Sequence, residues 1–319
     1  MAKAKQAPPP EKPKFIFFRG EFVPYEQAKV SVLCHGLNYG TGCFEGIRGY
    51  WNEAQQELYM LKMHPHFQRI HQSARILHMT LPYDVPQLCD IACELVRRNG
   101  YKEDVYIRPL LFMGDELIGV RLHNLRTEFT MFSVPMKDYI PTTGIRVCVS
   151  SWRRIDDNAV PARAKITGAY INSALAKTEA YDEGYDDAIF LNPDGHVSEG
   201  SAMNLFMVRD GELCTPGINH NILEGVTRRA VMKIAEQELG MKVIERSIDR
   251  TELYVCEELF LCGTGAQIAP IIEVDNRKVN GDGKIGPITQ RVADVYNRAA
   301  HGMEERFKGW VTPVYKPDR

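Results

Sequence analysis

The stretch of sequence that decides the fold contains two tight turns. Asp187-Ala-Ile-Phe-Leu191 and His196-Val197 are strand-like runs on either side of Asn192-Pro-Asp-Gly195, and two further runs flank Arg209-Asp-Gly211. Turn residues of this kind between apolar runs predict β-hairpins. Because a hairpin joins neighbouring strands that run in opposite directions, the stretch predicts an antiparallel sheet.

Helices and further strands surround this stretch. Apolar residues recur at the three-to-four spacing of a buried helix face in several segments, and shorter apolar runs predict strands. The strands and helices come in unequal runs rather than in strict alternation, which is typical of an α+β fold with mainly antiparallel strands and argues against a Rossmann doubly wound sheet. The predicted helices cover 65–79, 86–99, 170–181, 226–239 and 287–300, and other predicted strands cover 15–18, 105–113, 128–134 and 145–151.

A polar connector divides the chain into two predicted domains. Residues 137–144 carry a proline, a glycine and two threonines between strand-like runs, a composition typical of a link. The first 14 residues hold four lysines and four prolines without apolar periodicity, which predicts a flexible arm. We therefore expect the arm at 1–14, a small N-terminal α/β domain at 15–135, the connector at 136–144 and a larger domain at 145–319.

The composition excludes several classes of protein. Of the 319 residues, 39 are Lys or Arg and 41 are Asp or Glu, so the formal net charge of −2 leaves no excess of positive charge for a nucleic-acid backbone. No stretch approaches the roughly 20 apolar residues that span a bilayer, so we expect a cytoplasmic protein without a membrane partner. The eight cysteines form no CxxC pair, and the histidines at 64, 66, 71 and 78 lack flanking ligands, so we expect no metal site.

Four short segments place polar groups where strands end or helices begin, which is where binding residues tend to collect. The four segments are 164–170, 197–206, 224–228 and 262–266. Further motifs are Cys34-His-Gly-Leu-Asn-Tyr39-Gly-Thr-Gly-Cys-Phe44-Glu-Gly46-Ile-Arg48, Tyr106-Ile-Arg108-Pro-Leu, Ser150-Ser-Trp152 and Ile171-Asn-Ser-Ala-Leu-Ala-Lys177. In these segments and motifs, the sequence resembles the class IV (fold type IV) pyridoxal-phosphate aminotransferases, and most closely the branched-chain amino-acid aminotransferases.

The resemblance implies a two-domain fold, pyridoxal 5′-phosphate (PLP) as the cofactor, and a homodimer or a larger homo-oligomer. It also implies amino-group transfer between branched-chain L-amino acids (Leu, Ile or Val) and 2-oxoglutarate, which gives branched-chain 2-oxo acids and L-glutamate. An aldehyde cofactor needs an amine that can hold it covalently and then move a proton, and a lysine can do both. By resemblance that lysine is Lys165.

The resemblance also assigns the remaining cofactor contacts. Glu199 pairs with the pyridine nitrogen, and Tyr170 donates a hydrogen bond to the ring oxygen. A phosphate fits the start of a helix, where free backbone N–H groups and the helix dipole favour an anion. The implied phosphate contacts are Val226, Thr227, Thr264 and, where the family has an arginine, His64.

On the substrate side, the resemblance implies that one site recognises both an apolar amino acid and glutamate. Tyr106 and the backbone amides of Gly265 and Ala266 bind the α-carboxylate. Phe44 and Gly46 line the apolar pocket. The second carboxylate of glutamate is assigned to Arg108, whose planar fork suits a carboxylate, together with Tyr39 and Tyr139.

Some positions depart from the family pattern. With His64 in place of an arginine we expect weaker cofactor binding, since losing a charge-assisted hydrogen bond costs about 1.5 to 3 kcal/mol. Met203 stands where a second glutamate is usual. The lost positive charge at His64 and the lost negative charge at Met203 compensate if the two positions are neighbours. Met136 in place of a tryptophan, and Gly168-Ala169 in place of Gly-Asn, bear on the substrate range.

Other functions remain open from the sequence. Within the same class they are a D-amino-acid transaminase, an (R)-amine transaminase and an aminodeoxychorismate lyase. Outside it, a non-catalytic binding protein on the same scaffold is the alternative. Tyr39, Tyr106 and Arg108 favour the branched-chain interpretation.

Overall fold

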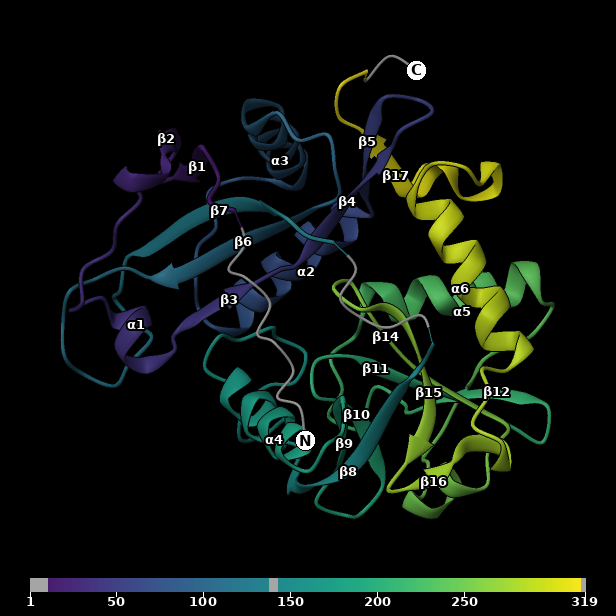
Figure 1. Cartoon of the computed structure of the whole chain (residues 1–319). Helices are drawn as coiled ribbons and strands as arrows, with labels where there is room; N and C mark the ends of the chain where they lie inside the picture. Colours follow the sequence, from purple (N-terminus) through teal and green to yellow (C-terminus); the bar gives the residue numbers. More distant parts are fainter. Residues whose placement is uncertain (1–10, 138–142, 317–319) are drawn as a thin grey trace.

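The computed structural model describes residues 11–137 and 143–316, so that most of the predicted arm, Tyr139 and the last three residues lie outside the described residues. Within these ranges the chain forms two β-sheets with helices packed on them (Figure 1). The first sheet contains eight strands: β1 (Phe15–Phe18), β2 (Glu21–Pro24), β3 (Gly42–Phe44), β4 (Ile47–Asn52), β5 (Glu57–Leu61), β6 (Val105–Met113), β7 (Thr127–Pro135) and β17 (Val311–Pro313). Their order is β17-β5-β4-β6-β7-β1-β2, with β3 beside β6.

The second sheet has nine strands among the described residues. They are β8 (Ile145–Arg153), β9 (Asp187–Leu191), β10 (Val197–Gly200), β11 (Asn204–Arg209), β12 (Glu212–Thr215), β13 (Ile244–Glu245), β14 (Glu258–Gly263), β15 (Gln267–Val274) and β16 (Arg277–Lys278). Their order is β10-β9-β8-β15-β14-β11-β12-β13, with β16 beside β15. Pairs β9–β10 and β11–β12 are antiparallel, at the two turns that the sequence indicated. The predicted α+β class with mainly antiparallel strands is confirmed.

Six α-helices accompany the sheets in the described part of the chain. They are α1 (His35–Tyr39), α2 (Met63–Ile76), α3 (Val85–Asn99), α4 (Tyr170–Asp182), α5 (Val226–Glu238) and α6 (Pro287–Ala300), and short 3-10 turns lie at Tyr25–Gln27, Arg250–Tyr254, Val279–Gly281 and Glu305–Trp310. Helix α3 begins with a capping box between Asp84 and Gln87 and is capped at its C-terminus by Gly100, whose φ of 72° is left-handed. None of the described helices is both long and apolar enough to cross a membrane.

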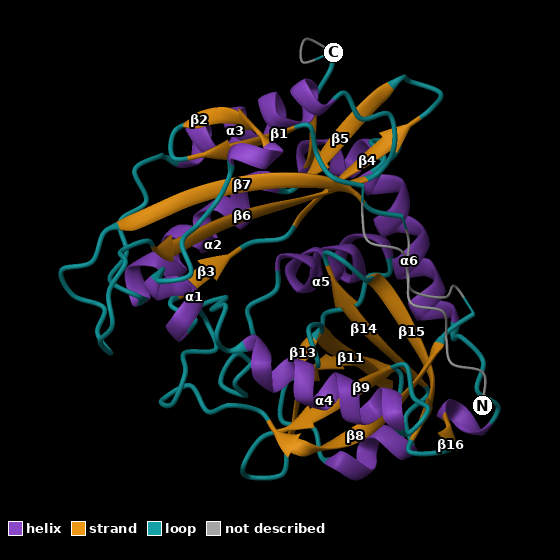
Figure 2. Ribbon diagram, turned by 60° about the vertical axis from the view of Figure 1, so that its left-hand side comes forward, coloured by secondary structure: helices purple, strands orange, loops and turns teal. Residues whose placement is uncertain are grey.

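Alternating side chains on the second sheet separate two apolar cores. Leu205 and Met207 of β11 belong to a core formed mainly by strands of the second sheet, whereas Phe206 and Val208 pack with α5 and α6 on the other face. This is the period of two that a strand covered on both faces requires. In Figure 2, α5 and α6 lie between the second sheet and the strands of the first.

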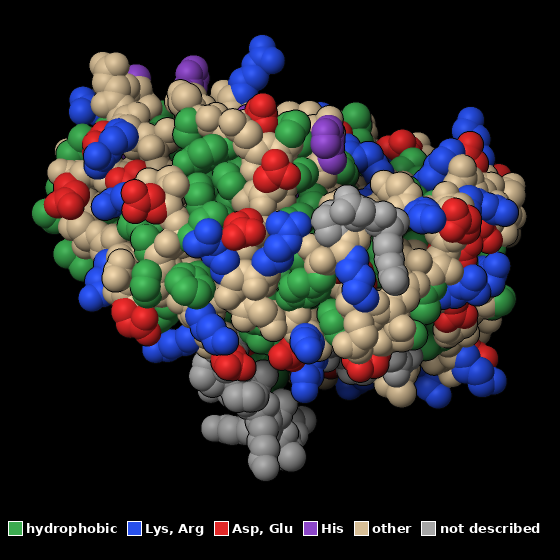
Figure 3. Space-filling view, turned by 90° about the horizontal axis from the view of Figure 1, so that it is seen from above, with side chains coloured by type: hydrophobic (Ala, Val, Ile, Leu, Met, Phe, Trp, Pro, Cys, Tyr) green, Lys and Arg blue, Asp and Glu red, His purple; other side chains and the backbone are tan. Residues whose placement is uncertain are grey.

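The surface carries charges of both signs. On the face that Figure 3 displays, Lys and Arg side chains alternate with Asp and Glu side chains, without a broad field of one sign. That distribution agrees with a formal net charge of −2. A basic stripe of the kind that follows a nucleic-acid backbone is therefore not present on this face.

The end of the chain returns to the first sheet. Strand β17 pairs with β5, and the buried carboxylate of Glu57 accepts hydrogen bonds from the backbone N–H groups of Val314, Tyr315 and Lys316 at 3.0, 2.8 and 2.7 Å. Val314 is itself buried in the core of the first sheet. This differs from the expected domain at 145–319, because the last described residues complete the N-terminal sheet.

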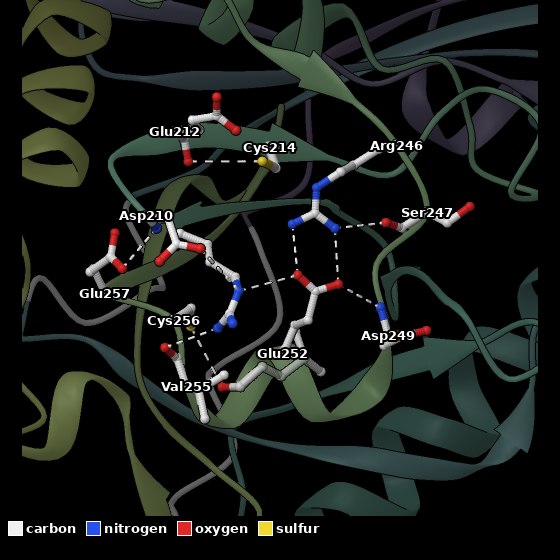
Figure 4. A network of polar contacts seen from close by, with 12 residues as sticks. Asp210, Glu212, Cys214, Arg246, Ser247, Asp249, Glu252, Val255, Cys256 and Glu257 are labelled. Carbon is white, nitrogen blue, oxygen red and sulfur yellow. Dashed lines mark hydrogen bonds and ion pairs between the residues drawn. The ribbon is translucent and has the colours of Figure 1, made fainter.

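A compact polar network supports the turn after β13 (Figure 4). The carboxylate of Glu252 receives two hydrogen bonds from the guanidinium of Arg246, at 2.9 and 2.6 Å, and one from the backbone N–H of Asp249 at 3.0 Å. Hydrogen bonding by Arg246 lowers the pKa of Glu252. The ionised carboxylate therefore stabilises the folded state.

We expect Glu252→Gln to lower the free energy of unfolding at pH 7 by about 1 to 2 kcal/mol, because the guanidinium of Arg246 loses the opposing charge and one of its two acceptor oxygens on that side chain. Since the folded pKa of Glu252 is depressed, its contribution is full above the unfolded value of 4.5 and is lost as the pH falls through the folded value. The difference between variant and wild type should therefore shrink on acidification. Urea unfolding at pH 7 and pH 4 measures it, and an equal difference at both would contradict the expectation.

Candidate active site

A cavity of about 770 Å³ is formed by residues from both sheets and from the loops between them. It brings together residues that are far apart in the sequence. Twelve of the predicted site residues line it: Phe44, Gly46, Tyr106, Arg108, Lys165, Tyr170, Glu199, Val226, Thr227, Thr264, Gly265 and Ala266.

Lys165 extends into this cavity from the loop before α4. Its backbone is held by the first domain, since its carbonyl accepts a hydrogen bond from the N–H of Phe44 at 3.0 Å and its N–H donates to the hydroxyl of Ser73 at 3.2 Å. Its Nζ donates to the hydroxyl of Tyr170 at 2.5 Å and lies 5.0 Å from the ring centre of Phe44. The amine is thus fixed among groups that a substrate would meet.

Glu199 is a buried carboxylate that lines the same cavity. The register of β10 shifts between Val197 and Gly200, and such irregularities commonly redirect a side chain beside a site. One carboxylate oxygen lies 2.8 Å from Nη2 of Arg154, and the other accepts hydrogen bonds from Asn204 and from the backbone N–H of Leu223 at 2.9 and 3.1 Å. Burial raises the pKa of Glu199, while the charge of Arg154 opposes that rise.

The start of helix α5 forms one end of the cavity. Its N-cap is Gly225, which has no side chain to satisfy the first N–H groups, and Val226 and Thr227 follow as cavity-lining residues. A Cβ on Gly225 would lie 2.0 Å from Oδ1 of Asn204, so only glycine fits here. The hydroxyl of Thr264 lies 3.4 Å from Nε2 of His66 beside the same cavity. The end is therefore rich in donors for an anion.

The cation at this end is Arg69 rather than His64, which corrects the sequence prediction. His64 is exposed on α2 and does not line the cavity, whereas Arg69 is buried and does. Five residues of an α-helix correspond to a rotation of about 500°, which turns the two side chains about 140° apart. The spacing along the helix could have identified Arg69, since it lies three residues after the buried His66 and beside Ile70 of the apolar face.

This correction removes two expectations that depended on His64. The site does contain an arginine, so weaker cofactor binding no longer follows from a missing one. Met203 is buried and lines the cavity, whereas His64 points to solvent, so the two do not form a compensating pair.

A buried ion pair holds Arg69 in place. Glu45 accepts hydrogen bonds from Nε and Nη2 of Arg69, both at 2.7 Å, and its Oε2 lies 2.7 Å from Nδ1 of His66. Burial alone would raise the pKa of Glu45, but Arg69 and His66 lower it to about 2. Burial lowers the pKa of His66 below its usual value. The carboxylate is thus ionised, and a neutral imidazole donates to it from Nδ1.

The substrate side of the cavity combines two polar side chains with apolar walls. The hydroxyl of Tyr106 accepts hydrogen bonds from Nε and Nη2 of Arg108 at 3.1 and 2.9 Å. The guanidinium of Arg108 lies 4.3 Å from the ring centre of Phe44. A Cβ on Gly46 would lie 2.3 Å from the hydroxyl of Tyr106. Met136, Met203 and Ala169 also line the cavity, so the departures from the family pattern belong to its wall.

One predicted substrate residue, Tyr39, is not brought to the cavity of this chain. Tyr39, on α1, is not among the lining residues, and its hydroxyl accepts a hydrogen bond from the backbone N–H of Gly119 at 3.1 Å. Tyr139 lies outside the described residues. Sequence reasoning also missed Glu45 and Arg154, because the side chains that they contact are distant in sequence.

Comparison with known proteins agrees with this geometry. The family model described as amino-transferase class IV matches residues 42–274. A probable branched-chain-amino-acid aminotransferase from Aquifex aeolicus is 47% identical over 302 residues, which cover 94% of this chain and 97% of that protein. The branched-chain-amino-acid aminotransferase of Escherichia coli is 37% identical over 95% of this chain and 98% of its own length.

Solved structures agree as well. The branched-chain aminotransferase of Thermoproteus uzoniensis with norvaline has a TM-score of 0.91 and 43% identity, covering 95% of this chain and 100% of that one. The branched-chain amino acid aminotransferase of Thermobaculum terrenum in its PLP form has a TM-score of 0.90 and 39% identity, covering 95% and 99%. The resemblance seen in the motifs is confirmed over nearly the full length. This chain belongs to the class IV aminotransferases.

Proposed function

We infer that this chain is a PLP-dependent branched-chain amino-acid aminotransferase, which moves the amino group of Leu, Ile or Val to 2-oxoglutarate. The observation that carries this function is one cavity that gathers Lys165, Tyr170, Glu199 and the start of α5. Identities of 37% to 47% with proteins of that name over nearly the whole chain support the substrate class. Because the aminotransferase residues remain together, a non-catalytic binding protein is not favoured.

The residues present fit PLP. The N-terminus of α5 has no side-chain cap at Gly225, and Arg69, Thr227 and Thr264 line the same cavity, which suits a phosphate dianion. The buried carboxylate of Glu199 suits the ring nitrogen, and Lys165 lines the same cavity. When bound, PLP supplies an aldehyde and an electron-withdrawing ring.

The side chains of this chain would then act on the proton that moves during transfer. Lys165 Nζ can hold and release a proton next to the reacting carbon, and Tyr170 keeps that amine oriented through its hydroxyl. Glu199 can hold the proton of the ring nitrogen through one oxygen, while Arg154 and Asn204 fix the carboxylate plane. Phe44 and Ala266 line the cavity and would give the reacting centre an apolar surface.

Three amino donors with 2-oxoglutarate as acceptor test the substrate class. L-leucine should react fastest, because the Arg108–Tyr106 pair offers donors to a carboxylate while Phe44, Met136 and Met203 offer an apolar wall. D-alanine and (R)-1-phenylethylamine represent the alternatives within the class. Glutamate formation measures all three, and activity with only the amine would overturn the proposal.

We expect Gly46→Ala to weaken amino-acid use about tenfold or more in kcat/KM. The new methyl group would lie 2.3 Å from the hydroxyl of Tyr106, so Tyr106 must move away from its hydrogen bonds with Arg108. Steady-state kinetics with L-leucine measures the effect. Gly309→Ala is the matched control, since a Cβ there meets no atom within 4 Å. Equal kinetics in the two variants would contradict the placement of Gly46 in the pocket.

A homodimer is part of the proposal. Several large apolar side chains are exposed on α1 and on the loop that contacts Tyr39, among them Leu37 at 63%, Ile118 at 73% and Val120 at 91%. A patch of this kind is typical of a protein interface. A second copy would cover it and bring Tyr39 next to the partner's cavity. Light scattering after gel filtration measures the mass, and Val120→Lys should shift it toward the monomer.

A further inference from the structure

Glu45 lies between two residues of the substrate wall but serves a different part of the site. Its neighbours Phe44 and Gly46 line the cavity, whereas the Glu45 side chain is fully buried against α2. There it contacts Arg69 and His66, whose other partners lie in two loops of the second sheet. One carboxylate thus links the substrate wall to the cation at the other end of the cavity.

The hydrogen bonds of Arg69 show how completely it is held. Its guanidinium has five N–H donors. Among the described residues, Nε and Nη2 donate to Glu45, and Nη1 donates to the carbonyl of Glu224 at 2.9 Å. One hydrogen on each Nη atom is left, and Arg69 lines the cavity. The fork is therefore held through one side while two donors are kept for a ligand.

His66 connects Glu45 to a second residue beside the cavity. Its Nδ1 lies 2.7 Å from Glu45, and its Nε2 lies 3.4 Å from the hydroxyl of Thr264. Since His66 is neutral and donates from Nδ1, its Nε2 accepts and can orient that hydroxyl. Glu45 therefore reaches both Arg69 directly and Thr264 through one imidazole.

We propose that Glu45 is a positioning residue for the phosphate of PLP, which fixes the directions of Arg69 and, through His66, of Thr264. This inference rests on the proposed function, in which the phosphate binds at that end of the cavity. A long arginine side chain loses rotamer freedom when it is ordered. Glu45 has already ordered it before the cofactor arrives, so less affinity is lost on binding.

Two cofactor probes that differ only in the phosphate test the proposal. Full-length apoprotein is titrated with PLP and with pyridoxal, and binding is followed by absorbance. Glu45→Gln should weaken PLP about tenfold or more, in the range of a charge-assisted hydrogen bond, and leave pyridoxal within about twofold. An equal loss for both probes, or no loss for PLP, would overturn the proposal.

Glu252→Gln is the matched control, because Glu252 also holds an arginine fork and lies outside the cavity lining. It should lower stability without changing the affinity for PLP. If Glu45→Gln gives no folded protein, Glu45→Asp takes its place, since it keeps the charge but shortens the reach, and the same selective loss is expected. Wild-type apoprotein that fails to bind PLP would instead contradict the proposed function.

A double-mutant cycle separates positioning from a general loss of packing. In an Arg69→Lys background, Glu45→Gln should weaken PLP much less than it does in the wild type, because the residue through which it acts has changed. The ³¹P resonance of bound PLP gives a second readout, and it should shift in Glu45→Gln and stay in place in Glu252→Gln. Fully additive losses with an unshifted resonance would overturn the proposal.

Discussion

Replacing Lys165 with alanine should lower the rate of amino transfer from L-leucine to 2-oxoglutarate by about 10⁴-fold or more. Positioned acid–base catalysis alone contributes about 10² to 10⁴, and the variant also loses the amine that holds the cofactor. Tyr170 cannot substitute, because its hydroxyl is the partner of that amine rather than a second amine. Glutamate formation at saturating PLP measures the rate.

A chemical readout accompanies this kinetic one. Borohydride reduction of the wild type should leave the cofactor attached after unfolding, whereas Lys165→Ala should release it. Lys233→Ala is the control, since Lys233 is an exposed lysine on α5 paired with Glu236. Activity of Lys165→Ala within tenfold of this control would refute the assignment of the lysine.

Glu199→Gln should lower the rate of transfer by about 10² to 10³, the range seen when one preorganised electrostatic partner is removed. The amide keeps the shape of the carboxylate and can still accept from Asn204, but it has no charge to hold a proton on the ring nitrogen. It also leaves Arg154 without its anion in a largely buried position. The visible spectrum of the bound cofactor should change with the rate.

Glu258→Gln controls for the loss of a buried carboxylate as such. Glu258 accepts hydrogen bonds from the backbone N–H groups of Ile288 and Thr289 at the start of α6 and does not line the cavity. We expect it to lower the midpoint of thermal unfolding and to leave kcat within about twofold. If the two variants lose activity equally, Glu199 has only a structural role.

Local signals in the sequence were enough to predict most elements of the fold. Helix α6 begins at Pro287 as expected, because a proline at the first turn has no N–H to lose. The turn at Gly195 lies where predicted, with a positive φ of 92° that suits glycine. In both cases the cause lies within a few residues, which is why a single sequence carries it.

Features that depend on contacts between distant residues could not be predicted from the sequence. The pairing of β17 with β5 joins residues about 250 positions apart, and no local sequence pattern predicts it. Helix α2 begins at Met63, two residues before its predicted start, because Lys62 adopts a left-handed conformation. Family position alone favoured His64 over Arg69, whereas the rotation of α2 decides which side chain reaches the cavity.

The return of the C-terminus to the first sheet has a consequence for the order of folding. Glu57 is synthesised early, but the three amides that it binds leave the ribosome more than 250 residues later. Long-range pairings of this kind form slowly, because a large loop must close first. We expect the first sheet to stay unfinished during synthesis, with β5 an open edge until residues 311–316 have emerged. Nascent chains stopped before Val311 should therefore be more susceptible to proteolysis near β5 than released ones.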